Sequence, residues 1–288
     1  MVVATGVKAP ASKEKKQSRA VKSLSAWEIV KISRHPSRPV LQDYIQLVFE
    51  NFVELHGDRY FGDDNAIIGG FATLGKQKVM LIGHNKGKNT LEHIERNFGM
   101  AKPEGYRKAL RLMKLAQRFN LPVVTIIDTP GAFPGLEAEE RGQAESIAKN
   151  ITEMANIEVP IVSLVIGEGG SGGALGIGVG DRIIMLSNAI YSVISPEGCA
   201  SILWRDAKFA PDAAEALKIT SYALKENGVI DEIISEPGEG AHTDYNATGA
   251  AVKNTILKNL NVLLQIPTEK LLDERFEKYA AMGKFAVD

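Results

Sequence analysis

A glycine-rich segment is the part of this sequence whose residue types could do chemistry. Residues 167–173 read GEGGSGG and follow an apolar run that begins after Pro160. Because glycine has no side chain, a ligand can approach such a backbone closely, and left-handed backbone angles carry no steric penalty. The small residues from Ala174 to Val179 predict a short helix, whose first N–H groups have no partner within the helix. We expect those N–H groups to face an anion or a developing oxyanion.

Three kinds of chemistry compete for this segment. Gly167-x-Gly169-x-x-Gly172 fits a dinucleotide fingerprint, but the next predicted strand, residues 183–186, does not end in the acidic residue that a ribose requires. The pattern G-x-S-x-G around Ser171 fits a serine hydrolase, with His242 as the only histidine that follows.

The third interpretation is an oxyanion hole made of glycine N–H groups, with no nucleophile. A purely structural interpretation, a tight turn packed between a helix and a sheet, accounts for two or three of the glycines but hardly for all of them.

A second loop is predicted beside the first. Residues 121–128 (LPVVTIID) indicate a strand buried on both faces, and residues 129–135 (TPGAFPG) follow it. Ligands of open α/β sheets lie outside the carboxyl ends of the strands, so we expect this loop and the glycine segment to lie side by side. Two prolines also suit a rigid turn, and both interpretations can hold together.

The elements that position these segments alternate between strands and helices. Ser25-x-x-Glu28 predicts a capping box, and Pro36 ends the helix that follows. A second helix is expected to present one apolar face and to end at Gly57. The members of that face are Tyr44, Leu47, Val48, Phe52 and Leu55.

A hairpin across Gly75 is predicted next, from runs at residues 67–74 and 78–82. His84, Lys86 and Lys88 follow the hairpin and could contact the phosphates of a ligand, although basic residues in a loop are more often only solvated. A long helix opening at Pro103 comes next.

In the second half, residues 182–186 and 189–194 are expected to form adjacent strands, and residues 195–198 (SPEG) open a helix. Further helices are predicted at residues 213–226 and 244–264, around a short strand at 229–234.

Composition limits the class of protein. The chain has 288 residues, of which 44% are hydrophobic, so it can bury one large core. The formal net charge is -1, which gives no argument for nucleic-acid binding. The single cysteine, Cys199, excludes a disulfide within the chain and suits a reducing compartment such as the cytoplasm. No apolar run is long enough to span a bilayer.

Two parts of the chain differ in character. Residues 1–24 are basic and show no periodicity, so we expect a disordered tail. Residues 25–288 contain no repeat and no low-complexity linker, so we expect a single domain. The pattern of elements fits an α/β spiral of strand-strand-helix units with helices outside.

Four motifs follow one another along the chain: NFGM with PEGYRKA at residues 97–109, DTPGA at 128–132, GEGGSGGAL at 167–175 and ISPEGCAS at 194–201. Together, and in this order, they closely resemble the alpha subunit of the carboxyltransferase component of bacterial-type acetyl-CoA carboxylase. The resemblance covers about residues 25–264. Where the family often carries a longer helical N-terminal arm, this chain begins with a short basic tail.

The resemblance implies a crotonase-like fold and a reaction in which carboxybiotin, delivered by a separate carrier protein, carboxylates acetyl-CoA to malonyl-CoA. It implies a beta subunit with a zinc ribbon, an alpha2beta2 assembly, and cooperation with a biotin carboxylase. No metal is expected in this chain, which lacks the cysteines of a zinc site. Neither a membrane nor nucleic acid is an expected partner.

By the same resemblance, the amides of Gly172 and Gly173 are the oxyanion donors, since the reaction generates oxygen-centred anions. Whether they hold the thioester enolate or the biotin urea oxygen stays open. The expected substrate-binding residues are Thr129, Gly131, Ala132, Gly169, Gly170, Ser171, Ser195 and Pro196.

Two further expectations concern Glu197 and the two helices that contain mostly small residues. Glu197 is expected to serve as a helix cap or dipole partner rather than as a general base. The small-residue helices at 172–179 and 196–202 are expected to expose an apolar subunit interface.

Overall fold

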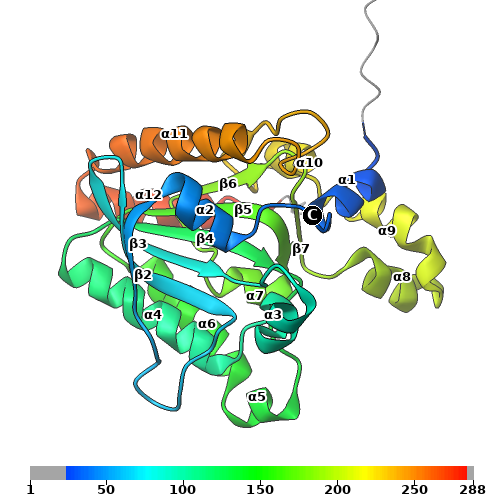
Figure 1. The fold of residues 1–288 in the computed structure, drawn as a ribbon, viewed down its shortest axis with the longest axis horizontal. Helices are drawn as coiled ribbons and strands as arrows, with labels where there is room; N and C mark the ends of the chain where they lie inside the picture. The colour runs from blue at the N-terminus through cyan, green and yellow to red at the C-terminus, as the bar shows by residue number, and fades with distance from the viewer. Residues whose placement is uncertain (1–23, 284–288) are drawn as a thin grey trace, which may run out of the picture.

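An eight-stranded sheet forms the centre of the computed structural model, which describes residues 24–283 (Figure 1). The strands lie in the order β1-β2-β3-β4-β5-β6-β8, and β7 pairs with the far end of β5. The first three strands are antiparallel and the others are parallel. The strands are β1 (Glu50–Glu54), β2 (Ile67–Leu74), β3 (Gln77–His84), β4 (Val123–Thr129), β5 (Ile161–Gly170), β6 (Arg182–Leu186), β7 (Ile190–Ser192) and β8 (Glu232–Ile234).

Helices surround the sheet. Figure 1 shows α11 along one side, α4 and α6 along the other, and α8 and α9 together with α1 at one end. The helices are α1 (Ala26–Ser33), α2 (Leu41–Val48), α3 (Thr90–Glu95), α4 (Pro103–Arg118), α5 (Leu136–Glu140), α6 (Gln143–Ala155), α7 (Ser171–Leu175), α8 (Pro196–Trp204), α9 (Ala210–Ala216), α10 (Ser221–Glu226), α11 (Tyr245–Leu263) and α12 (Thr268–Ala280). No helix in the described part of the chain is long and apolar enough to cross a membrane.

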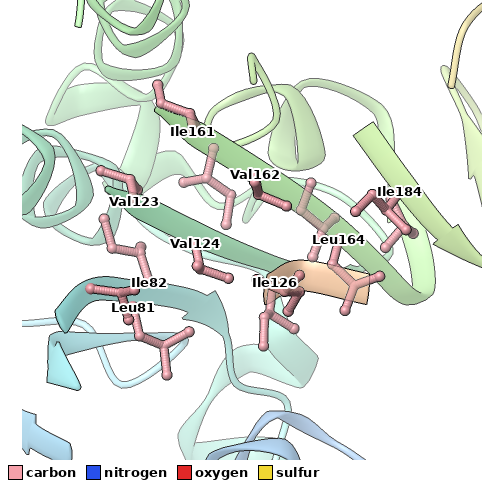
Figure 2. Packing of buried hydrophobic residues seen from close by; sticks show 14 of the residues in the cluster. Leu81, Ile82, Val123, Val124, Ile126, Ile161, Val162, Leu164 and Ile184 are labelled. Atoms are coloured by element: carbon pink, nitrogen blue, oxygen red, sulfur yellow. The ribbon is translucent and has the colours of Figure 1, made fainter. Parts of the chain in front are cut away.

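The core lies where the parallel strands are covered on both faces. All seven residues of β4 are buried, and so are the first seven of β5. Strands buried on both faces appear in sequence as nearly continuous apolar runs, which is why these two strands were predictable. Figure 2 shows Val124 and Val162 between the side chains of neighbouring strands.

Several predicted boundaries are confirmed by local hydrogen bonds. The Glu28 amide donates to Ser25 Oγ at 3.2 Å and the Ser25 amide to Glu28 Oε2 at 2.7 Å, which completes the predicted capping box. Pro103 opens α4, where its missing N–H costs nothing. Gly75 turns the β2–β3 hairpin with a φ of +60°.

The prediction of one helix through Phe52 and Leu55 is wrong. Helix α2 ends at Val48, and the chain continues as β1, which pairs with β2 through Val53 and Phe71. A Cβ on Gly70 would lie 2.0 Å from the Val53 carbonyl oxygen, so glycine permits this close approach of the two strands. The pairing partner lies about twenty residues further along the chain, beyond the reach of helical periodicity.

The second half of the chain holds three more differences. The prediction that β7 lies beside β6 is wrong. Strand β7 pairs with residues 168–170 of β5, and β8 lies beside β6. The predicted helix at 213–226 is two helices, α9 and α10, and Lys218 between them has a φ of +54°. Helix α12 was not predicted. The predicted disordered tail lies, except for Leu24, outside the described residues.

Candidate active site

The glycine segment is held on both sides by neighbouring strands. The predicted loop of residues 167–173 is wrong as a loop, because β5 continues to Gly170 and α7 begins at Ser171. Gly169 pairs with Thr129 of β4 on one side and with Tyr191 of β7 on the other. The distant strand β7, which sequence patterns did not place here, therefore extends the ladder to the end of the segment. This arrangement fixes the start of α7 relative to the sheet.

Glycines 170 and 173 let two backbones touch. A Cβ on Gly170 would lie 2.1 Å from the Pro130 carbonyl oxygen, and one on Gly173 would lie 2.4 Å from the Gly131 carbonyl carbon and 2.6 Å from the Ala132 nitrogen. No side chain fits at such distances. The expectation that the two segments lie side by side is therefore confirmed, and the contact is made by main chain alone.

Free amide groups gather at this contact. The N–H groups of Gly172 and Gly173 lie in the first turn of α7, and no hydrogen-bond acceptor is found for them among residues 24–283. The Ala132 amide, next to Gly173, likewise has no acceptor in the described structure. Peptide donors fixed by a sheet need no reorganisation when a negative oxygen develops, so the arrangement can stabilise an oxyanion.

A groove of about 380 Å³ opens beside Gly172. Its walls come mostly from apolar side chains of α7, β7, α10 and the chain around α12. They include Leu175, Tyr191, Val193, Leu217, Leu224 and Met282. Ser171 and Gly172 form part of the lining, whereas Gly173 is buried behind it. A Cβ on Gly172 would lie 3.8 Å from Ile147, so this glycine, unlike Gly173, has space around it.

Ser171 has the backbone of a strained turn, but among residues 24–283 no catalytic base is hydrogen-bonded to it. Its φ is +49°, and it stands between a strand and a helix, as the nucleophile of an α/β hydrolase does. However, no hydrogen bond joins Ser171 to any histidine in the described residues. His242 stacks instead on His35, with 3.9 Å between the ring centroids. The geometry therefore does not favour the serine hydrolase.

The Thr129 side chain is used to shape its own loop. Its hydroxyl donates to the Gly131 carbonyl at 2.7 Å and accepts from the Gly131 amide at 3.1 Å. Gly131 has a φ of +159°, which is close to extended backbone. The hydroxyl thus closes the turn that carries the Ala132 amide toward Gly173.

A buried polar cluster lies behind the glycine segment. Asp128 accepts hydrogen bonds from Lys86 Nζ at 2.8 Å and from the Glu168 amide at 3.0 Å. His84 is fully buried, and neither of its ring nitrogens has a hydrogen-bond partner in the described structure. Burial lowers the pKa of His84 to about 4, against the opposing influence of Asp128 and of the Gly173 main chain. The imidazole is therefore neutral at pH 7.

The three basic residues considered for phosphate contact differ in their surroundings. His84 is buried, Lys86 pairs with Asp128, and Lys88 pairs with Asp43 at 2.5 Å. The charges of both lysines are compensated within the fold, and the possible phosphate contact does not extend to His84, which is buried.

Arg34 joins the glycine segment to α8. Its guanidinium contacts Glu168 at 2.7 Å and Glu197 at 2.5 Å. Burial raises the pKa of Glu197, but the hydrogen bond from Arg34 outweighs it and holds the pKa below its usual range. An ionised, paired carboxylate in the first turn of α8 agrees with the expected dipole partner. Sequence reasoning missed Arg34, because it lies more than 130 residues from either carboxylate.

Ser195 and Pro196 start α8. The Ser195 hydroxyl accepts from the Gly198 amide at 3.1 Å, and Pro196 occupies the first turn. Both residues lie outside the lining of the groove beside Gly172.

Comparison with known proteins gives the family. Residues 5–283 match the family described as acetyl co-enzyme A carboxylase carboxyltransferase-like. The chain belongs to this family. The acetyl-coenzyme A carboxylase carboxyl transferase subunit alpha of Methylococcus capsulatus is 59% identical over 263 residues, which are 91% of this chain and 82% of that protein. The corresponding subunit of Chlorobium luteolum is 56% identical, over 91% of this chain and 80% of that protein.

Solved structures agree on the fold of this carboxyltransferase-like chain. A transcarboxylase 12S structure matches with a TM-score of 0.63 at 17% identity, over 91% of this chain and 46% of that one. The beta subunit of Pseudomonas aeruginosa geranyl-CoA carboxylase matches with a TM-score of 0.62 at 17% identity, over 92% and 48%. The fold is the crotonase-like α/β spiral that was expected. In residues 24–283, no group of three or more His, Cys, Asp or Glu side chains could hold a metal ion.

Proposed function

We propose that this chain is the alpha subunit of an acetyl-CoA carboxylase carboxyltransferase. It would carry the carboxyl group of carboxybiotin to acetyl-CoA and form malonyl-CoA for fatty acid biosynthesis. The observation that carries the proposal, beside the family, is the meeting of free amides from Gly172, Gly173 and Ala132 at the carboxyl ends of β4 and β5.

The role of these amides follows from the charge that the reaction develops. Removing a proton from the acetyl methyl group places negative charge on the thioester oxygen, and preorganised N–H groups stabilise that oxygen. Gly172 lines the groove and is the donor with direct access, whereas Gly173 lies buried against the 129–132 turn.

The groove beside Gly172 suits the ring system of biotin. Its apolar walls, including Leu175, Tyr191 and Val193, would enclose a compact bicyclic group. Carboxybiotin, delivered by a separate carrier protein, supplies the carboxyl group and the nitrogen that receives the methyl proton. The residues of this chain contribute binding, orientation and exclusion of water.

Partners are proposed from the exposed face at the α8 end. Val193, Ile202 and Leu203 are 75%, 71% and 64% exposed, although they are large and apolar. Such side chains gathered on one face usually mark a subunit interface. We propose that a beta subunit with a zinc ribbon covers it in an alpha2beta2 assembly, and that a biotin carboxylase recharges the carrier. Residues 25–288 would form a single carboxyltransferase domain.

Reconstitution tests the proposed reaction. The full chain, combined with a beta subunit of the same family, should form malonyl-CoA from acetyl-CoA and carboxybiotin, and neither subunit should do so alone. Failure of the combined subunits would remove the proposal. Labelling of Ser171 by a fluorophosphonate would instead support the serine hydrolase interpretation.

A matched pair of variants tests the oxyanion role. Gly172→Pro removes the N–H at a first-turn position that tolerates proline, whereas Gly172→Ala keeps it. We expect the proline variant to lose about 10²-fold to 10³-fold in kcat, the range for one oxyanion donor, and the alanine variant to lose less. Because Ser171 before it has a φ of +49°, both variants are first compared in unfolding temperature. Equal rates in two folded variants would exclude the donor role.

A further inference from the structure

A basic groove lies between α4 and α6, with a lining that shares no residue with the groove beside Gly172. It has a volume of about 520 Å³, and ten residues line it. Five of the ten are basic and only Glu145 is acidic, in a chain whose net charge is -1. The basic members are Arg107, Arg111, Lys114, Arg118 and Lys149. A concave surface lined by one sign of charge concentrates ions of the opposite sign.

Part of this positive charge is not compensated within the fold. Arg118 and Lys149 have neither an ion pair nor a hydrogen bond in the described structure, and both are exposed. Arg111 donates only to the main-chain carbonyls of His56 and Gly57. Burial and the neighbouring charge of Arg59 lower the pKa of Arg111, and the carboxylates of Asp63 and Asp58 oppose this only in part.

The other two basic side chains of the groove, Lys114 and Arg107, already form ion pairs with carboxylates, so they are not counted as binding groups for an anion. Lys114 contacts Glu153 at 2.9 Å, and Arg107 contacts Asp58 at 2.8 Å. Three cations, on α4 and α6, therefore remain to meet an anion. Three cations that line one groove suit a group with several negative oxygens better than a single carboxylate.

Exposed aromatic rings stand at the end of the groove. A second cavity, of about 710 Å³, shares Arg107, Glu145 and Lys149 with the first and is lined in addition by Tyr60, Phe61, Glu140, Arg141 and Gly142. These rings are 86% and 63% exposed.

Each ring already has a cation on one face. Arg107 Cζ lies 5.2 Å from the Tyr60 ring centroid, and Arg141 Cζ lies 4.5 Å from that of Phe61. A ring backed by a guanidinium on one face and open to solvent on the other is a platform on which a flat base can stack.

We propose that the α4–α6 groove and the adjoining aromatic pair form a binding site for a nucleoside polyphosphate. The base would stack on Tyr60 or Phe61, and the phosphates would lie along the groove against Lys149, Arg111 and Arg118. None of these residues is among those placed at the oxyanion site, so the site is tested separately from the reaction, and only its assignment to coenzyme A rests on the proposed function. Two sources offer the same chemistry, a free nucleotide and the nucleotide portion of coenzyme A.

Binding to the full chain tests the site. A fluorescent ADP derivative is titrated by anisotropy and displaced by ADP, 3′,5′-ADP, coenzyme A or pyrophosphate. We expect saturable binding that weakens as salt is added. Tighter displacement by coenzyme A and 3′,5′-ADP than by ADP would identify coenzyme A as the source, and the reverse would identify a free nucleotide. Absence of saturable binding up to about 1 mM, the weak end of specific affinities, would overturn the proposal.

Charge variants locate the phosphates. Lys149→Ala combined with Arg118→Ala should weaken ADP and pyrophosphate at least tenfold. Lys270→Ala, a matched control on α12 where Lys270 is exposed and contacts only Glu274, should leave binding unchanged. An equal effect of the control would show general charge attraction and would overturn the site.

Aromatic variants separate a nucleotide from a bare anion. Tyr60→Ala combined with Phe61→Ala should weaken ADP roughly fivefold to a hundredfold, the loss expected on removal of base stacking, while pyrophosphate binding is retained. Phe276→Ala, which removes an exposed ring on α12, is the control. If the double variant binds ADP as tightly as the parent, the proposal that the ligand is a nucleotide is wrong. It is also wrong if a single-stranded oligonucleotide binds more than tenfold tighter than ADP.

Discussion

The glycine segment and the α8 end of the molecule are built in opposite ways. Around Gly170 and Gly173 the main chain contacts main chain, with strands on both sides and no space for a Cβ. At the α8 end, α8 packs on α9 and exposes Ile202 and Leu203 to solvent, and Val193, which precedes the helix, is exposed as well. Between the two lies Arg34, which pairs with a carboxylate of each region.

This difference distinguishes the oxyanion donors, which the chain fixes by its own packing, from the apolar face, which a partner subunit must cover. Donors that need preorganisation are fixed by packing within one subunit, because a misplaced donor loses its advantage. An apolar face left in water carries no such internal partner and gains free energy only when another surface covers it. The following variants test each side of this contrast, from the largest expected effect to the smallest.

Gly173→Ala should have the largest effect on stability. The added methyl group would lie 2.4 Å from the Gly131 carbonyl carbon, where only backbone can move. We expect the free energy of unfolding to fall by at least about 3 kcal/mol, the upper part of the range for overpacking. Gly172→Ala, with 3.8 Å to its nearest neighbour, should change it by no more than about 1 kcal/mol. Equal losses in urea unfolding would show that the two glycines do not differ in packing.

His84 should make the buried side of the site sensitive to acid. Its folded pKa is about 4, below the value of about 6.5 for an unfolded histidine. As pH falls from about 7 to 4, His84 becomes protonated in the unfolded chain but stays largely neutral in the folded one. The free energy of unfolding therefore falls by about 3 kcal/mol. Above about pH 7 both states are neutral and this contribution is constant.

The variant His84→Gln should lack this part of the pH dependence. Urea unfolding of both proteins at pH 7.5 and pH 4.5 measures it, and His56→Gln, at an exposed histidine, serves as the control. If His84→Gln loses as much free energy of unfolding between pH 7.5 and pH 4.5 as the parent, then His84 is protonated in the folded chain or other groups set the acid sensitivity.

How far the sequence predicts this structure depends on how local each signal is. The fully apolar strands β4 and β5, the capping box at Ser25 and the helix opening at Pro103 all rest on neighbouring residues, and all are confirmed. Strand β1 and the position of β7 depend on pairing with distant strands, and both were predicted wrongly.

The site shows the same limit. Motifs identified the glycines and the 129–132 turn, and the structure brings them together. His84 looks like a loop residue in sequence, yet long-range packing buries it completely. Arg34 gave no signal, because an ion pair across more than 130 residues follows from topology rather than from spacing. The α4–α6 groove likewise required two helices to be placed side by side.

Glu197→Gln should have a modest effect on activity. The carboxylate is half-exposed and paired with Arg34, so loss of its charge weakens a link worth roughly 1 kcal/mol or less. We expect less than a tenfold fall in the reconstituted rate. Arg34→Met, which breaks the pairs to Glu168 and Glu197 together, should cost more. A loss near 10³-fold for Glu197→Gln, within the range of about 10²-fold to 10⁴-fold for general acid–base catalysis, would give this residue the catalytic role denied to it here.

Ile202→Ser with Leu203→Ser should have the smallest effect on the isolated chain. Both side chains are mostly exposed, so the free energy of unfolding should change by no more than about 0.5 kcal/mol, as at other surface positions. Ala200→Leu, at a buried position of the same helix, should cost about 1–3 kcal/mol by overpacking. The serine variant should nevertheless bind the beta subunit at least tenfold more weakly, because the apolar face is what the partner covers. A clear loss of stability in the isolated chain would show that this face is already covered there, and an unchanged affinity would move the interface elsewhere.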